Sequence, residues 1–336
     1  MKPDNKNWRR IDDLYPSDNW GRKSRFYWKK ENIERLGFKY KKGRAYKIII
    51  KKVNFKNKIL ANVFFSQHGL APKVYRVGNF KWWKFIEMDY VPRRKTDILM
   101  TRTMIEVASR DVDFIKIYEH DLVHRNNYRY NKFVDYHGFE IDLPKFKSWL
   151  YERIKQDTHW GHKNDKNENY PYQTFSDFKG KRQTIYRIGK LGLDQIDFKG
   201  KSVLDIGCNM GVFLYYAKEE GADKLVGVDI KEVIRLAELY EYYKTNGGIE
   251  FYGETLTPDT IDKYGKFDVV LYLAMVHSLE YPEKLKKITK ELLIFEGHNL
   301  MDKNKTENEL SKIFNKVIFK GFTEDRGSRP VFWCYV

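Results

Sequence analysis

The chain has 336 residues and a formal net charge of +17. This length suffices for two hydrophobic cores, and an aromatic content of 16% argues against global disorder. No apolar run approaches the roughly 18–20 residues that a membrane-spanning helix needs, and the polar start predicts no secretion signal. Only two cysteines occur, Cys208 and Cys334, which favours a reducing, cytoplasmic location over a disulfide-stabilised exported protein.

The positive charge is concentrated in the first half of the chain. Residues 1–150 hold 34 basic and 17 acidic residues, whereas residues 151–336 hold 29 of each. A basic segment beside a neutral one predicts that the first half meets an anionic partner: RNA, a nucleotide or a phosphoglycan. The alternative is a charge that serves only solubility.

The first half mixes short strands and helices, which predicts a small α+β domain over residues 1–155. In chain order, the predicted elements are two short strands around the turn Lys41–Arg44 within 38–53, a helix at 57–68, strands at 73–77 and 83–88, a helix at 97–118 and a strand at 132–135. Residues 156–179 are polar and aperiodic, and we predict that they form a linker.

Strands and helices alternate through the second half, residues 180–336. The predicted order is helix 182–193, strand 202–206, helix 212–220, strand 224–229, helix 231–245, strands 249–252 and 267–273, helix 282–290, strand 291–296, helix 305–313, and strands 316–322 and 330–336. This alternation predicts an α/β fold with a mostly parallel, doubly wound sheet. The two last strands have no helix between them, so they are expected to form an antiparallel edge.

A glycine loop comes directly after the first strand of this half. Gly207 and Gly211 allow sharp turns and close approach of a ligand, and Asn209 tolerates a positive φ. The next strand ends in Asp229, 24 positions after Asp205, where a carboxylate can accept hydrogen bonds from ribose hydroxyls. The loop lacks G-x-G-x-x-G, and the Asp205 carboxylate would disfavour a dinucleotide pyrophosphate but suit a cation. The alternative is a tight turn with a helix cap.

These motifs resemble those of class I S-adenosylmethionine (SAM)-dependent methyltransferases over residues 180–336. The resemblance implies a Rossmann-like, seven-stranded sheet, a loop at 205–211 that binds the methionine part of SAM, ribose binding by Asp229, and adenine contacts by Glu254. The full predicted cofactor set is Asp205, Gly207, Cys208, Asn209, Gly211, Asp229, Ile230, Glu254, Tyr272 and Arg182.

Methyl transfer needs a positioned nucleophile, and a general base only where the acceptor loses a proton. His277, which comes after strand 267–273, is the predicted base, and a packed or exposed loop histidine is the alternative. His298 is a weaker candidate for the acceptor pocket. The charged turn 323–330 is predicted to be solvated, with Arg326 or Arg329 as alternative ligands of an acidic acceptor.

The segment after strand 267–273 narrows the acceptor chemistry. The Asn/Asp-Pro-Pro-aromatic motif of amino-group methylation is missing there, which favours an oxygen acceptor. The sequence offers no paired-cysteine cluster, so no metal site is predicted.

The first half carries a looser resemblance to the kinase-like fold of choline and aminoglycoside kinases. Lys47 looks like a phosphate-pairing lysine, and Asp121, Asn126 and Asp135 look like a catalytic loop with its metal ligands, which implies ATP and Mg²⁺. The sequence departs from that pattern because the helix at 57–68 offers Asn62 in place of a glutamate. An inactive descendant and an unrelated basic binding domain are therefore alternatives.

These resemblances lead to three hypotheses about function. A methyltransferase fused to a kinase-like domain resembles enzymes that cap bacterial surface polysaccharides, so O-methylation of an anionic glycan or small molecule is the main hypothesis. The second hypothesis is an RNA methyltransferase whose basic first half binds the phosphate backbone of the RNA. The third is a SAM-binding subunit without activity, which the intact loop disfavours.

Overall fold

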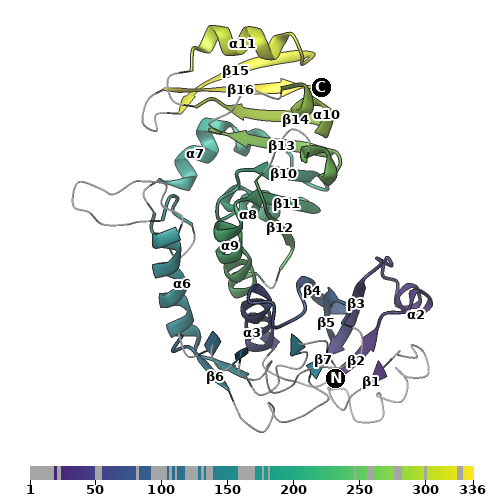
Figure 1. Ribbon diagram of the computed structural model, residues 1–336. Coiled ribbons are helices and arrows are strands. Elements are labelled where there is room, and N and C mark those ends of the chain that lie inside the picture. Colours follow the sequence, from purple (N-terminus) through teal and green to yellow (C-terminus); the bar gives the residue numbers. More distant parts are fainter. Residues whose placement is uncertain are drawn as a thin grey trace, which may run out of the picture. The chain divides into compact units, whose positions relative to one another are not determined.

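A computed structural model of the chain divides into two units, one formed by residues 1–147 with 239–248 and one by 148–238 with 249–336 (Figure 1). The structure describes residues 19–20, 24–49, 55–80, 83–91, 104–105, 108–109, 112–117, 128–129, 132–133, 139–157, 171–175, 178–180, 182–245, 247–255, 260–275, 282–298, 301–323 and 328–336.

The first unit is built on a five-stranded antiparallel sheet in the order β1-β2-β3-β5-β4. Its strands are β1 (Asn19–Trp20), β2 (Ser24–Tyr27), β3 (Arg44–Ile49), β4 (Val74–Phe80) and β5 (Trp83–Asp89). Two short sheets pair β6 (Ile115–Ile117) with β9 (Phe139–Ile141), and β7 (Tyr128–Arg129) with β8 (Lys132–Phe133). Its helices include α2 (Lys30–Arg35) and α3 (Phe55–Gln67).

Helix α3 explains how this unit builds a core. Residues 57–65 of the helix are all buried, so the helix lies inside the unit instead of covering its surface. Phe64 and Phe65 extend the core through edge-on ring contacts with Phe114 and Phe139, at centroid distances of 5.7 and 5.3 Å. A second apolar cluster lies around Tyr46 on β3.

Two predictions for this unit were wrong. The segment 38–53 was expected to hold two strands around a turn, but within its described residues, 38–49, residues 38–43 are irregular and strand structure begins with β3 at Arg44. The predicted turn is present, since Gly43 has a φ of +80° and the Arg44 N–H donates to the Lys41 carbonyl. The first strand is missing because β3 pairs with β2 and β5 on its two edges, which leaves no place beside it for residues 38–40. The helix expected at 97–118 does not reach its predicted end, because β6 begins at Ile115 and pairs with β9.

Helix α6 (Leu143–Asp157) was not predicted, although its signal is present in the sequence. Phe146, Leu150 and Ile154 recur at a spacing of four residues and are fully buried. This is the apolar stripe of an amphipathic helix. The two N-terminal strands and α2 were also missed, because polar and charged residues surround their few apolar positions.

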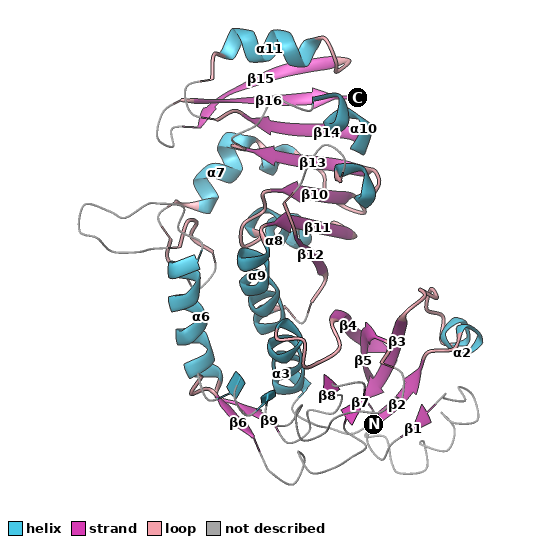
Figure 2. Ribbon diagram, viewed as in Figure 1, coloured by secondary structure: helices cyan, strands magenta, loops and turns pink. Residues whose placement is uncertain are grey.

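The second unit confirms the predicted α/β fold. Its seven-stranded sheet has the order β12-β11-β10-β13-β14-β16-β15, with all neighbours parallel except those of β16 (Figure 2). The strands are β10 (Ser202–Ile206), β11 (Lys224–Asp229), β12 (Ile249–Gly253), β13 (Phe267–Leu273), β14 (Thr289–Glu296), β15 (Lys316–Thr323) and β16 (Arg329–Tyr335). The predicted antiparallel edge is therefore correct.

Helices pack along this sheet and bury its apolar residues. They are α7 (Thr184–Leu191), α8 (Val212–Glu219), α9 (Lys231–Lys244), α10 (Pro282–Ile288) and α11 (Lys303–Ser311), with short 3₁₀ turns η2 (Leu193–Gln195) and η3 (Ile261–Tyr264). Helix α8 packs on β10 and β11, α10 on β13 and β14, and α7 on β15. Within the described residues, no helix has the length and hydrophobicity needed to cross a membrane.

Candidate cofactor site

The glycine loop connects the buried strand β10 to α8 in the second unit. Gly207, Asn209 and Gly211 have φ angles of 75°, 50° and 74°, so the loop needs three left-handed residues within five positions. The backbone N–H groups of Gly207 and Cys208 both donate to the Val228 carbonyl of β11, at 2.8 and 3.1 Å. The loop is thereby tied to the neighbouring strand at the carboxyl edge of the sheet, where ligands of such folds bind.

Space, as well as φ, requires glycine in this loop. A Cβ atom at Gly207 would lie 2.5 Å from Sδ of Met275, and one at Gly211 would lie 2.8 Å from the Phe251 ring. Both distances are below van der Waals contact, so a side chain at either position would have to displace a neighbour. The loop backbone is therefore closely surrounded.

Asp229 holds the loop from the end of β11. One carboxylate oxygen accepts the Asn209 N–H and the other accepts the Ile230 N–H, both at 2.7 Å. Burial raises the pKa of Asp229, and these two backbone hydrogen bonds oppose that rise. Carboxylate oxygens have further lone pairs, so Asp229 remains able to accept hydrogen bonds from hydroxyl groups.

Asp205 is the most unusual group of the site. Its side chain is 2% exposed, and its Oδ2 atom has no hydrogen-bond partner among the described residues. Burial, and then the charge of Asp229, raise the pKa of Asp205 to about 8, while the cation of Arg187 opposes the rise. A buried carboxyl oxygen without a partner is costly, which marks Oδ2 of Asp205 as a group that awaits a cation or a donor.

The third strand places Glu254 next to Asp229. The Glu254 N–H donates to the Asp229 carbonyl at 2.8 Å, and the Glu254 carboxylate pairs with Lys263. Tyr272, in contrast, is 4% exposed and stacks on Phe295 at 6.0 Å inside the core. The structure therefore brings Asp205, Asp229 and Glu254 to one edge of the sheet but places the Tyr272 ring in the sheet's packing.

Arg182 belongs to a compact segment ahead of α7. It pairs as an isolated bridge with Gln173, and its guanidinium donates to the Tyr172 hydroxyl and lies 4.3 Å from the centre of that ring. Both Arg182 and Gln173 are buried, at 7% and 5% exposure. Tyr172 and Gln173 lie in the predicted linker, residues 156–179, and these contacts tie them to Arg182 ahead of α7.

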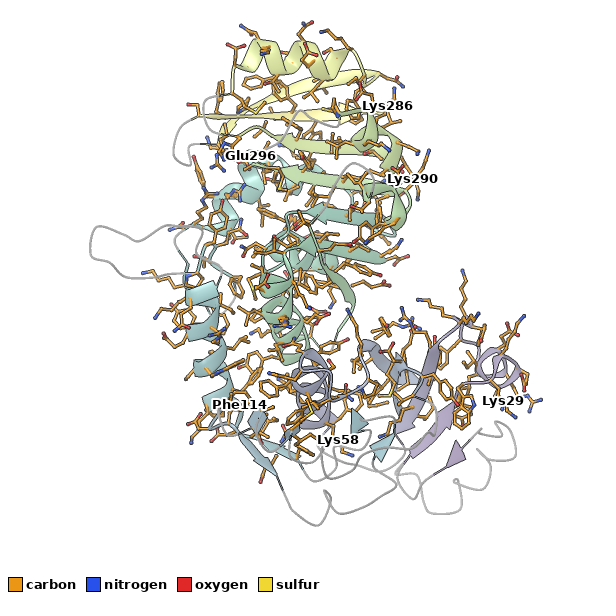
Figure 3. The ribbon with its side chains drawn as sticks, in the orientation of Figure 1. Lys29, Lys58, Phe114, Lys286, Lys290 and Glu296 are labelled. Carbon is orange, nitrogen blue, oxygen red and sulfur yellow. The ribbon has the colours of Figure 1, made fainter. Side chains whose placement is uncertain are left out.

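Beyond β13, charged residues gather at the carboxyl end of β14, where Glu296 is labelled in Figure 3. Glu296 is fully buried and accepts hydrogen bonds from Arg187 and Thr323. Burial, and then the charge of Arg329, lower the pKa of His298. Arg329 is only 5% exposed, so the prediction of a solvated turn is wrong for this residue.

Sequence reasoning did not single out Arg187. Its signal was a cation on the apolar side of a helix, next to Ile188 and four residues before the buried Leu191. Other predicted site residues lie outside the described part of the chain: the base candidate His277, the possible acceptor ligand Arg326, and the kinase-like set of Asp121, Asn126 and Asp135. Lys47 is described, and it lies on the central strand β3 with 5% exposure. No cluster of three metal-binding side chains occurs among the described residues.

Comparison with known proteins finds a family match within the second unit. Residues 178–301 match a protein family described as "Methyltransferase domain", and the match does not extend to residues 1–177. The matched residues include strands β10 to β14 of the mostly parallel seven-stranded sheet.

The similar curated proteins include methyltransferases of two kinds. A tRNA U34 carboxymethyltransferase from Campylobacter hominis is 32% identical over 110 residues, covering 32% of this chain and 37% of that protein. A ubiquinone biosynthesis O-methyltransferase from Pectobacterium atrosepticum is 27% identical over 128 residues, covering 36% of this chain and 52% of that protein. The matches thus span between about a third and a half of these relatives.

Among solved structures, the bifunctional kinase-methyltransferase WbdD aligns with a TM-score of 0.40 at 19% identity. That alignment covers 49% of this chain and 43% of WbdD.

Proposed function

We propose that the chain is a SAM-dependent methyltransferase that acts on an anionic acceptor. The observation that carries the proposal is the fully buried Asp205 carboxylate, whose Oδ2 atom lacks a partner among the described residues beside a closely packed glycine loop. Such a group fits the cationic methionine end of SAM and would repel the pyrophosphate of a dinucleotide. When bound, SAM supplies a methyl group that a sulfonium activates for transfer.

The remaining cofactor residues are assigned from their places around the loop. The backbone at Gly207, Cys208, Asn209 and Gly211 approaches the methionine part. Asp229 and the adjacent Ile230 receive the ribose, and Glu254 faces the adenine region. Arg182 is proposed to close the site from the segment ahead of α7. Tyr272 supports the site through its packing.

The acceptor is proposed to present an oxygen nucleophile and a negative charge. His277 is the proposed base that removes the acceptor proton, because it comes after β13 at the carboxyl edge of the sheet. If His277→Ala keeps full turnover at saturating acceptor, this role is wrong. Arg329 and His298 lie on the same edge and offer positive charge and hydrogen bonds to an acidic group.

The anionic character of the acceptor rests on the first unit. Its described segments between residues 24 and 91 contain fourteen basic residues and only four acidic ones. A phosphoglycan or an acidic small molecule is the main proposal for the partner. RNA is the second, and it is favoured by the tRNA-modifying relatives and by the same charge.

We further propose that a domain formed by residues 1–155, most of which belong to the first unit, binds nucleotide in a kinase-like manner, with residues 156–179 linking it to a methyltransferase domain at 180–336. The supporting observation is Lys47, a buried lysine on the central strand of a five-stranded sheet. In the chain, α3 comes between β3 and β4. In this proposal, Lys47 pairs with phosphate, and Asp121, Asn126 and Asp135 serve ATP and Mg²⁺.

Two binding experiments test these proposals. Titration calorimetry with SAM and with its demethylated product should give heat for both, and a folded protein that binds neither ligand would disprove the methyltransferase proposal. ATP–Mg²⁺, a phosphoglycan and a short RNA are then titrated at increasing salt. Binding that requires both ATP and Mg²⁺ supports the nucleotide proposal, whereas a steep salt dependence with RNA supports backbone contacts.

A further inference from the structure

A buried ion pair joins the helix ahead of the cofactor loop to the carboxyl end of the sheet. Arg187 on α7 is 4% exposed, and its Nη2 donates to Oε2 of Glu296 at 2.5 Å. Glu296 ends β14, and its other oxygen accepts the hydroxyl proton of Thr323 at the end of β15. One carboxylate therefore holds together three elements that are distant in sequence.

Stability alone is a weak explanation for this pair. The cost of removing two charges from water often exceeds the attraction between them, and apolar substitutes of similar volume are frequently as stable. Helix α7 also has another anchor, because Trp333 Nε1 of β16 donates to the Leu191 carbonyl at 2.9 Å. Because the Arg187 cation is buried beside the candidate cofactor site, we expect it to influence the charge of groups in that site.

The Arg187 guanidinium also faces the glycine-loop side of the unit. Its central carbon lies 5.2 Å from the ring of Phe213, which belongs to the first turn of α8. The charge acts on Asp205, where it opposes the combined effect of burial and of Asp229 on the pKa.

The titratable groups that face Asp205 come from three elements. They are Asp229 at the end of β11, Cys208 in the loop and Arg187 on α7. Burial, and then Asp229 and Asp205, raise the pKa of the Cys208 thiol well above its ordinary value, so this thiol is neutral. Arg187 is thus the cation that acts on Asp205 within the described part of the chain.

We propose that Arg187 is a positioning residue of the cofactor site: held by Glu296 and lying against Phe213 at the start of α8, it fixes α7 against the carboxyl edge of the sheet and keeps a buried cation beside the glycine loop. This inference rests on the proposed function. In this proposal, Glu296 orients Arg187 through their buried ion pair.

The first test measures the pH dependence of SAM binding. Calorimetry from pH 6 to pH 9 compares the wild type with Arg187→Met and Arg187→Lys. In Arg187→Met, affinity should fall about tenfold at pH 7 for each unit by which the Asp205 midpoint rises. The loss should shrink toward pH 9, because Asp205 then ionises without help. Arg187→Lys should restore most of the affinity, and the control Lys190→Met on the same helix should stay within about twofold.

The Glu296→Gln variant distinguishes an electrostatic role of the Arg187–Glu296 pair from a purely structural one. It retains an oxygen acceptor for Arg187 but removes the negative charge that offsets the guanidinium. The midpoint for SAM binding should therefore move to lower pH, opposite to its movement in Arg187→Met. A merely structural pair would weaken binding in both variants by a factor that does not vary with pH, and that result would overturn the proposal.

A cofactor-free measurement keeps this inference distinct from the proposed function. The carboxyl carbon of Asp205, labelled with ¹³C and followed by NMR, reports its midpoint directly. The midpoint should rise in Arg187→Met, and an unchanged midpoint in a folded variant would refute the electrostatic role. If the wild type binds neither SAM nor its product, the proposed function fails, whereas the NMR titration still decides the role of Arg187.

Discussion

The Asp205→Asn variant offers a prediction in which stability and ligand binding move in opposite directions. The folded protein raises the pKa of Asp205 to about 8, chiefly through burial and then through Asp229, whereas the unfolded chain ionises the group near pH 4. Between these two values the unfolded state loses a proton that the folded state keeps. The wild type therefore loses stability as the pH rises through this window, and asparagine removes that loss.

The size of the effect depends on the width of the window. One pKa unit corresponds to about 1.4 kcal/mol, so the carboxyl costs the fold at most about 1.5 kcal/mol at pH 5 and about 5–6 kcal/mol at pH 8. The asparagine amide carries a packing cost of its own, but this cost does not depend on pH. Relative to the wild type, Asp205→Asn should therefore gain on the order of 2–4 kcal/mol between pH 5 and pH 8, after allowance for relaxation.

The assay is scanning calorimetry of cofactor-free protein at the two pH values, because a bound ligand would add its own stabilisation. At about 2–4 °C per kcal/mol, the melting temperature of the variant relative to wild type should rise by on the order of 5–10 °C between pH 5 and pH 8. The same variant should lose SAM binding, because the amide cannot pair with a cation.

Asp268→Asn is a matched control of opposite sign. Burial pushes the pKa of Asp268 upward, but hydrogen bonds from Ser202 and the pairing with Lys290 outweigh it and lower the pKa to about 2. This carboxylate stabilises the fold above pH 4, and that stability is lost only as the pH falls toward 2. The control should therefore be destabilised equally at pH 5 and pH 8. If Asp205→Asn behaves in the same way, the argument from burial is wrong.

Three further substitutions, one of them a control, test the packing around the site. Gly207→Ala places a side chain at positive φ, at a cost of about 1–2 kcal/mol, and its Cβ meets Sδ of Met275; Gly69→Ala, just after the end of α3, has a similar φ of +73° but open space. By urea unfolding, Gly207→Ala should lose more stability than Gly69→Ala because only its Cβ displaces a neighbour, and equal cofactor affinities would contradict a role for the tight loop. Trp333→Phe removes the hydrogen bond to Leu191 and should cost about 1–3 kcal/mol, as measured by thermal unfolding; an unchanged midpoint would show that α7 needs no such anchor.

The central strands of the seven-stranded sheet could be predicted closely from the sequence because they are buried on both faces. The predicted bounds of β10, β11 and β13 are the observed ones. Such strands are continuous apolar runs between turn-forming residues, and these signals are local. The same holds for the loop at 205–211, whose glycines are required by the φ angles of the residues themselves.

The first unit was harder to predict because its elements are short and depend on distant partners. Strand β6 lies within a segment with helical spacing, and its pairing with β9, more than twenty residues later, determines its conformation. Helix α3 is an exception, because the spacing of its apolar residues predicted a helix at 57–68 and the helix is observed at Phe55–Gln67. Its burial on all sides was not predicted, since the sequence indicated a single apolar face.

The sequence by itself determined the succession of strands along the chain and placed Asp205, Asp229 and Glu254 at or next to their ends. A parallel sheet brings such ends to one edge. Only the tertiary structure paired Arg187 with Glu296, which are 109 positions apart. No local pattern encodes that pair. Its formation depends on how α7 packs against the sheet, and so does the charge that acts on Asp205.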